Sequence, residues 1–279
     1  MLPVKTLGNV IYIPTGPALE YSPLALNLYT GCLHNCVYCY APTAMRKTRA
    51  QFHLGVKPRE NILERLEKQC KKIKGSSKQI LLCFSCDPYQ PEDPKVKVRR
   101  YKNLNDPTKL GRILIDHMSR KTVHGVKSVT REALLILEKY EMKATVLTKG
   151  GTRACRDFDI LQRNGWSFGT SINHFFDYGM TEWEPEPCAT PLNRVKAIEI
   201  AHSMGIKTWV SLEPVIYPVS ALAVINQLVG IVDHWKIGKL NHNREVSGRI
   251  DWAWFIREVE RALKDRDFYI KKSLEKYRA

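Results

Sequence analysis

Short apolar runs alternate with longer segments of helical periodicity along the chain, and this alternation predicts most of its secondary structure. Apolar runs of about four to six residues that are bounded by turn residues are typical of buried strands. We expect such strands at residues 25–29, 79–84, 144–148, 167–172, 208–212 and 234–237. Helices are expected to follow them, at residues 58–74, 130–140, 156–163, 191–204, 220–229 and 252–263.

Six strand–helix units in strict order favour an α/β fold in which helices cover a parallel sheet. Because a closed barrel of this type needs eight units, the pattern predicts a partial (β/α)6 TIM-like barrel. We expect a single domain over residues 1–279, with an N-terminal extension at 1–23 and a C-terminal helical region at 238–279. In such folds, ligands bind at the carboxyl ends of the strands.

One connection is much longer than the others and strongly basic. The interval 88–128, between the second strand and the second helix, exceeds the usual length of such connections. Within it, residues 95–127 carry ten Lys and Arg against two Asp, a net +8 of the +16 carried by the whole chain. This insertion favours a polyanionic partner, and nucleic acid first. A solvated flap without a partner is the alternative, and the sequence leaves both open.

The overall composition is that of an ordinary folded protein. Of the 279 residues 44% are hydrophobic and 26% charged, which argues against wholesale disorder. The N-terminus lacks the basic and apolar regions of a signal peptide. The most apolar stretch, 221–232, is too short to span a bilayer. We therefore expect a soluble, cytoplasmic protein that does not interact with a membrane.

Three of the eight cysteines, Cys32, Cys36 and Cys39, lie in the run Gly-Cys-Leu-His-Asn-Cys-Val-Tyr-Cys-Tyr. In a reducing compartment, clustered cysteines indicate metal ligands rather than disulfides. Three thiolates can ligate three irons of a four-iron cluster and leave the fourth iron open to an outside ligand. The alternative is a structural zinc site with Cys83 or Cys86 as fourth ligand. We favour it less because such closely spaced cysteines give poor tetrahedral geometry.

The Cys-x3-Cys-x2-Cys triplet directly after a first strand resembles the signature of the radical S-adenosylmethionine (SAM) enzymes. The longer run around it resembles the branch related to spore photoproduct lyase. Four later segments at successive strand ends are similar to that branch as well, so the resemblance covers about residues 24–237 without the insertion. These segments are Ser85-Cys86-Asp87-Pro88-Tyr89-Gln90-Pro91, Leu147-Thr148-Lys149, Thr170-Ser171-Ile172-Asn173 and Glu213-Pro214-Val215.

The resemblance implies a [4Fe-4S] cluster and SAM as cofactors. Cys32, Cys36 and Cys39 would ligate the cluster, and SAM would bind its open iron. An electron donor such as flavodoxin or ferredoxin would reduce it. By the same resemblance, Tyr38 would lie against the adenine of SAM. The other predicted SAM contacts are all strand-end polar residues: Lys149 and Ser171 at its carboxylate, Ser85 near its amino group, and Asp87, Asn173 and Glu213. The alternatives are a cap of the turn at Pro88 for Asp87, a solvated charge for Lys149, and ordinary strand-end polar groups for Asn173 and Glu213.

Three further side chains have predicted catalytic roles by resemblance. Tyr38 and Tyr40 would relay a hydrogen atom, with plain packing as the alternative for Tyr40. Cys83 would donate a hydrogen atom to a substrate radical. Strand alternation supports this, because it places Cys83 and Ser85 on one face. A small buried core residue is the equally open alternative for Cys83.

The predicted function is that of a radical SAM enzyme that cleaves SAM and acts on DNA or another nucleic acid. One alternative is a radical SAM enzyme that modifies a peptide or a small molecule. Another is a zinc-stabilised nucleic-acid-binding protein without catalysis. The insertion and the region after residue 237 have no counterpart in the resemblance, so the substrate stays open.

Overall fold

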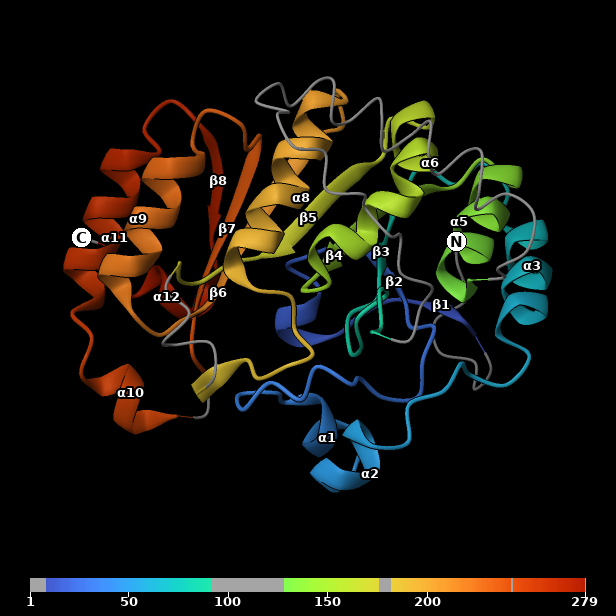
Figure 1. Cartoon of the computed structure of the whole chain (residues 1–279), viewed down its shortest axis with the longest axis horizontal. Coiled ribbons are helices and arrows are strands. Elements are labelled where there is room, and N and C mark those ends of the chain that lie inside the picture. Colours follow the sequence, from blue (N-terminus) through green and yellow to red (C-terminus); the bar gives the residue numbers. More distant parts are fainter. Residues whose placement is uncertain (1–8, 92–127, 176–181, 242, 279) are drawn as a thin grey trace, which may run out of the picture.

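The computed structural model describes residues 9–91, 128–175, 182–241 and 243–278. The basic segment 95–127, to which the nucleic-acid prediction was tied, therefore lies outside the described residues. One sheet of eight strands forms the centre, in the order β1 to β8. Strand β1 is antiparallel to β2, and each later neighbour pair is parallel (Figure 1). The strands are β1 Ile11–Tyr12, β2 Leu24–Leu26, β3 Gln79–Leu82, β4 Lys143–Thr148, β5 Ser167–Ser171, β6 Thr208–Val215, β7 His234–Lys239 and β8 Asp267–Ile270.

The six predicted strands correspond to β2–β7, and the open α/β barrel is confirmed. Two strands at the sheet edges were missed. Strand β1 has only two residues, too few for a recognisable alternation. Strand β8 lies in the region 238–279 that was expected to be helical, and it pairs in parallel with β7. No pairing between β1 and β8 closes the described sheet.

Helices surround the sheet on its outer side, while α1 and α2 lie together below the sheet in this view and α10 lies apart from them at the lower left (Figure 1). Capping side chains stabilise the first turns of several helices. Thr190, before Pro191, accepts a hydrogen bond from Asn193 N, and Asp251 accepts one from Trp254 N. The helices are α1 Ala41–Ala44, α2 Arg49–His53, α3 Ile62–Lys72, α5 Val129–Lys139, α6 Phe158–Arg163, α8 Pro191–Ser203, α9 Pro218–Leu228, α10 Arg244–Gly248, α11 Trp252–Ala262 and α12 Lys272–Glu275, with 3₁₀ turns at Gly16–Ala18 and Gly151–Asp157.

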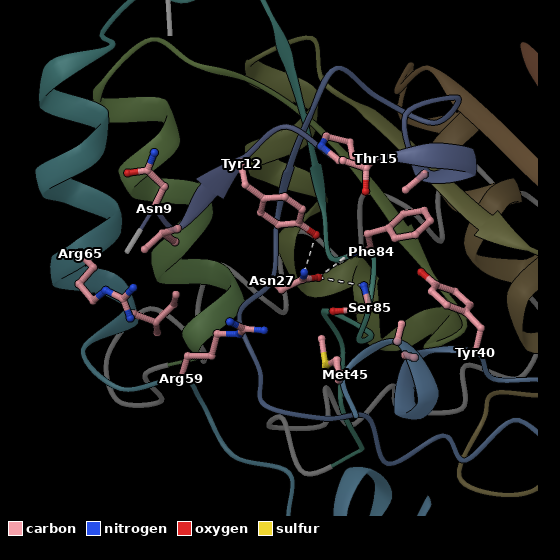
Figure 2. A pocket seen from close by; sticks show the side chains of 16 residues that line it. Asn9, Tyr12, Thr15, Asn27, Tyr40, Met45, Arg59, Arg65, Phe84 and Ser85 are labelled. Atoms are coloured by element: carbon pink, nitrogen blue, oxygen red, sulfur yellow. Dashed lines mark hydrogen bonds between the residues drawn. The ribbon is translucent and has the colours of Figure 1, made fainter. Parts of the chain in front are cut away.

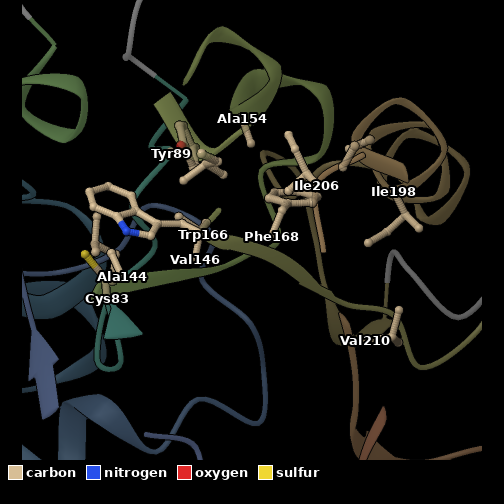
Figure 3. Packing of buried hydrophobic residues seen from close by; sticks show 14 of the residues in the cluster. Cys83, Tyr89, Ala144, Val146, Ala154, Trp166, Phe168, Ile198, Ile206 and Val210 are labelled. Atoms are coloured by element: carbon tan, nitrogen blue, oxygen red, sulfur yellow. The ribbon is translucent and has the colours of Figure 1, made fainter. Parts of the chain in front are cut away.

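Two clusters of buried side chains pack on the two faces of the sheet. The larger, outer cluster lies under the helices and contains Val146, Phe168 and Val210 of the sheet together with Ile198 of α8, all labelled in Figure 3. The smaller, inner cluster contains Leu81 and Trp209 from the opposite face. Each such buried side chain contributes about 1.5–3 kcal/mol. The period-2 alternation of the strands thus separates a helix-facing core from a barrel interior.

Side chains bridge the open side of the sheet. We call this region the seam. In it, Glu20 and Tyr21, which lie just before β2, contact β6–β8. The Tyr269 hydroxyl donates to Glu20 Oε2 at 3.0 Å. Lys236 Nζ donates to the carbonyl oxygens of Glu20 at 2.6 Å and Tyr21 at 3.0 Å. The chain therefore joins its first and last strands through side chains where backbone pairing is absent.

No helix in the described part of the chain is long and apolar enough to cross a membrane.

Candidate functional site

The three predicted metal-ligand cysteines lie on the loop that leaves β2 and enters α1. We call residues 31–40 the cysteine loop. It runs close against α2, because Cys32 N donates to the Phe52 carbonyl at 3.2 Å. A Cβ on Gly31 would lie only 1.9 Å from that same oxygen. Only glycine fits this approach, which explains the residue that precedes the first cysteine.

Arg49 of α2 fixes the shape of the cysteine loop. Its guanidinium donates to three successive carbonyl oxygens, those of Asn35 at 3.2 Å, Cys36 at 2.9 Å and Val37 at 3.2 Å. Asn35 has a left-handed backbone with φ of 48°, which turns the chain between the cysteines. Arg49 thus ties three successive backbone positions of the loop to α2.

All three loop thiols are free, with Cys36 buried and Cys32 and Cys39 partly exposed. Among the described residues, no three His, Cys, Asp or Glu side chains converge closely enough to hold one metal ion. Instead, Cys36 Sγ lies 3.8 Å from Cys188 Sγ. This contact lowers the pKa of the Cys36 thiol, although burial acts against it. Three thiols on one short loop are nonetheless the donor set that an iron–sulfur cluster requires.

Asp87, after β3, connects the cysteine loop to the end of β4. Its carboxylate lies 3.3 Å from His34 Nδ1 and accepts from the Thr148 hydroxyl at 2.6 Å, Lys149 N at 2.7 Å and Tyr89 N at 2.8 Å. Burial alone would raise the pKa of Asp87, but His34 and these hydrogen bonds outweigh it and lower the pKa to about 2. Asp87 therefore has a positioning role between the cysteine loop and the end of β4, and its predicted SAM contact stays a prediction.

Two of the predicted SAM residues have buried polar atoms without a hydrogen-bond partner in the described structure. They are Ser85 Oγ after β3 and Asn173 Oδ1 after β5. Asn173 uses its Nδ2 group to donate to the Pro214 carbonyl at 3.1 Å, so only its oxygen is left open. A buried polar atom without a partner is costly, and a bound ligand can supply the missing hydrogen bond. These two atoms fit a polar cofactor at the carboxyl ends of the strands.

Tyr38, Lys149 and Ser171 lie in one connected group. Lys149 Nζ lies 5.6 Å from the centre of the Tyr38 ring. The Tyr38 hydroxyl donates to Glu184, and Glu184 forms an ion pair with Arg194 at 2.6 Å. Arg194 in turn donates to the Ser171 carbonyl at 2.9 Å. The predicted residues at the ends of β4 and β5 are thus brought together with the cysteine loop.

A family model described as the radical SAM superfamily matches residues 26–221, more than half of the chain. The chain belongs to this superfamily. Radical SAM proteins use a [4Fe-4S] cluster and SAM, so these two groups are the cofactors of this chain. No curated protein matches the sequence.

Solved structures of spore photoproduct lyase share the fold of this radical SAM chain. A variant of that lyase with bound AdoMet and dinucleoside spore photoproduct matches with a TM-score of 0.53 and 15% identity, over 91% of this chain. A second variant matches with a TM-score of 0.54 and 13% identity, over 94% of this chain. The chain spans only 64% and 66% of those lyase chains. At this identity the likeness shows a shared fold.

Two predicted site residues lie elsewhere than expected in the radical SAM fold. Strand β3 ends at Leu82, so the alternation that was used to orient Cys83 stops before it. Leu81 and Phe84 both contact the inner cluster, whereas Cys83 is buried in the large outer one. Glu213 is bound within the seam, by Lys271 Nζ at 2.8 and 3.0 Å and by the Tyr21 hydroxyl. Its carboxylate thus forms an internal ion pair, and its predicted cofactor contact stays a prediction.

Tyr40 is 45% exposed, and its ring lies 5.9 Å from that of Phe84. It lines cavities on both sides of the cysteine loop. This placement is more open than plain packing would require.

Four residues of the radical SAM site were missed by sequence analysis: Arg153, Glu184, Cys188 and Arg194. Arg153 lies 2.7 Å from His34 Nε2, and the Cys188 thiol donates to the His34 carbonyl at 3.4 Å. Glu184 and Arg194 are almost completely buried. They come from segments more than 100 residues after the cysteine loop and carry no spacing signal. Only the fold brings them to the site.

Proposed function

We propose that this protein is a lyase-like radical SAM enzyme that acts on DNA or another nucleic acid. Its cofactors, when bound, supply a 5′-deoxyadenosyl radical through reductive cleavage of SAM. The observation that carries the proposal is the family match over residues 26–221, a region that contains both the cysteine loop and the unpartnered Ser85 Oγ and Asn173 Oδ1. The substrate class rests on the likeness to spore photoproduct lyase and on the basic insertion.

In this proposal, Cys32, Cys36 and Cys39 hold the cluster, and the Arg49 contacts orient their loop. Lys149 and Ser171 hold the SAM carboxylate, and Ser85 holds its amino group. Lys149 has no acidic partner among the described residues, and its Nζ lies beside the Tyr38 ring. Its positive charge therefore favours an anion, such as the SAM carboxylate, at this place. Asn173 supplies an acceptor for a SAM hydroxyl or amino group.

Tyr38 and Tyr40 are proposed to relay a hydrogen atom between substrate and cofactor. A tyrosine that gives up a hydrogen atom must release a proton as well as an electron, and Glu184 accepts the hydrogen bond of the Tyr38 hydroxyl. Burial raises the pKa of Glu184, which suits it to share that proton. A donor role for Cys83 requires the segment after β3 to turn its sulfur from the core toward the barrel interior.

An electron donor such as flavodoxin or ferredoxin and a cytoplasmic location complete the proposal, because a reduced cluster needs a reducing compartment.

The test is SAM cleavage by the anaerobically reconstituted protein, measured as 5′-deoxyadenosine with and without DNA, RNA and ultraviolet-irradiated DNA. We expect at least one nucleic acid to increase product formation. Equal rates with all three nucleic acids and with none would contradict the nucleic-acid substrate. An increase only with a peptide or a small molecule would replace it with the alternative substrate class.

A further inference from the structure

A cavity of about 470 Å³ opens beside the cysteine loop, between the N-terminal strand and the start of α3. Figure 2 shows its lining, with Tyr12 and Asn27 near the centre, Arg59 below them, and Ser85 and Tyr40 on the other side. This volume lies in the ordinary range for pockets that hold small organic ligands.

The cavity is positively charged. Arg59 and Arg65 line it, and none of the lining residues is Asp or Glu. Arg59 is anchored twice, since its backbone N donates to the Leu28 carbonyl at 2.9 Å and its Nε donates to the Tyr29 carbonyl at 3.2 Å. No carboxylate in the described part of the chain pairs with its guanidinium, which is only partly exposed. A fixed, half-buried guanidinium without a counter-ion favours an anion with paired oxygens, such as phosphate.

Neutral donors and aromatic rings surround this charge. The Tyr12 hydroxyl accepts a hydrogen bond from Asn27 Nδ2 at 2.6 Å, so its own hydrogen is directed elsewhere. Asn27 Oδ1 accepts from Phe84 N and Ser85 N, both at 2.9 Å, which fixes the amide. The aromatic residues Tyr12, Tyr40 and Phe84 line the same space. Aromatic rings beside a cation are the combination that binds a base together with its phosphate.

The cavity adjoins the proposed radical site. Ser85, whose Oγ lacks a partner, and Tyr40, a proposed relay residue, both line it. A ligand held by Arg59 would therefore lie on the substrate side of these two residues.

We propose that this cavity binds one nucleotide unit of the substrate, with its phosphate on Arg59 and its base against Tyr12 or Tyr40. This inference rests on the proposed function, but it assigns the substrate contact to described residues rather than to the basic insertion.

The test is equilibrium binding to the full-length reconstituted protein, measured by calorimetry and separately from SAM cleavage. The probes are thymidine, a 5′-phosphorylated thymidine dinucleotide, and a single-stranded thymidine octamer. We expect the dinucleotide to bind at least tenfold more tightly than thymidine. The octamer distinguishes a strand-binding groove from a pocket for free nucleotides, because only the groove gains affinity with length.

The key variant is Arg59→Gln, which should lose about tenfold in dinucleotide affinity and leave thymidine binding unchanged. Arg59→Lys should retain part of the affinity. Arg261→Gln is the matched control, since Arg261 is an exposed arginine of α11. Unchanged unfolding midpoints establish that each variant is folded.

Three results would overturn the inference: no dinucleotide binding, equal binding of thymidine and dinucleotide, or undiminished dinucleotide binding by Arg59→Gln. Dinucleotide binding without any 5′-deoxyadenosine production would contradict the proposed function and leave the binding site standing. Normal SAM cleavage without dinucleotide binding would contradict the binding site and leave SAM cleavage by the protein standing.

Discussion

The seam and the cysteine-loop site both bury charged and polar groups, but they differ in whether those groups have partners. In the seam, Lys271 is 3% exposed and its Nζ reaches both oxygens of Glu213. At the site, Ser85 Oγ and Asn173 Oδ1 are buried without a hydrogen-bond partner in the described structure. Buried polar groups with partners serve the fold, whereas those without one indicate a missing ligand. The sequence motifs predict the same role for Glu213 and Ser85, as cofactor contacts at strand ends. Only their contacts in the structure show the difference between them.

The largest effect on stability is expected in the seam. Lys271→Met leaves the largely buried Glu213 carboxylate, whose side chain is 15% exposed, without its cation, which should lower the free energy of unfolding by about 3–5 kcal/mol. Lys272→Met, at the exposed neighbouring lysine, is the control and should change little. Urea unfolding measures both. The double variant Lys271→Met/Glu213→Gln should recover part of the loss, and a double loss equal to the sum of the single losses would show that the pair is not coupled.

Asp87 lies at the site, but its oxygens have hydrogen-bond partners, as the polar groups of the seam do. Asp87→Asn should lower the free energy of unfolding by about 2 kcal/mol at neutral pH. The pKa of Asp87 is lower in the folded protein than the ordinary 3.8, so its contribution is complete above that pH and disappears as the pH falls toward about 2.

The measurement is urea unfolding of both proteins between pH 7 and pH 2, with Asp265→Asn as an exposed control. A difference that stays constant over this range would show that the carboxylate charge does not stabilise the fold.

Ser85 should behave in the opposite way from Lys271. Ser85→Ala removes a hydroxyl that has no partner, so the free energy of unfolding should change by less than about 0.5 kcal/mol. If Ser85 holds the SAM amino group, SAM affinity should fall about tenfold. Ser273→Ala removes another buried hydroxyl without a partner, in α12 and outside the site, and should leave SAM binding unchanged. Equal SAM affinity in the two variants would remove Ser85 from the cofactor site.

Local sequence pattern was sufficient for the six central strand–helix units, because apolar period and capping residues are local properties. It was insufficient for β8, because this strand is half-buried and is stabilised by its pairing with β7. The cysteine triplet was predicted because its ligands lie within eight residues. Glu184, Cys188 and Arg194 were missed because their contacts with the loop cross about 150 residues of chain. The internal contacts of Asp87 and Glu213 were missed because the sequence does not show which groups their oxygens bind.

The central claim is that the cysteine loop carries the cluster that cleaves SAM. Its most direct test is iron, sulfide and zinc content together with 5′-deoxyadenosine formation, in the wild type and in Cys36→Ala, after anaerobic reconstitution. Cys155→Ala, at a buried cysteine in the 3₁₀ turn, is the control. The account predicts about four irons and four sulfides per chain in the wild type and control, and loss of the cluster and of cleavage in Cys36→Ala. Bound zinc without iron, or cleavage that survives Cys36→Ala, would contradict it.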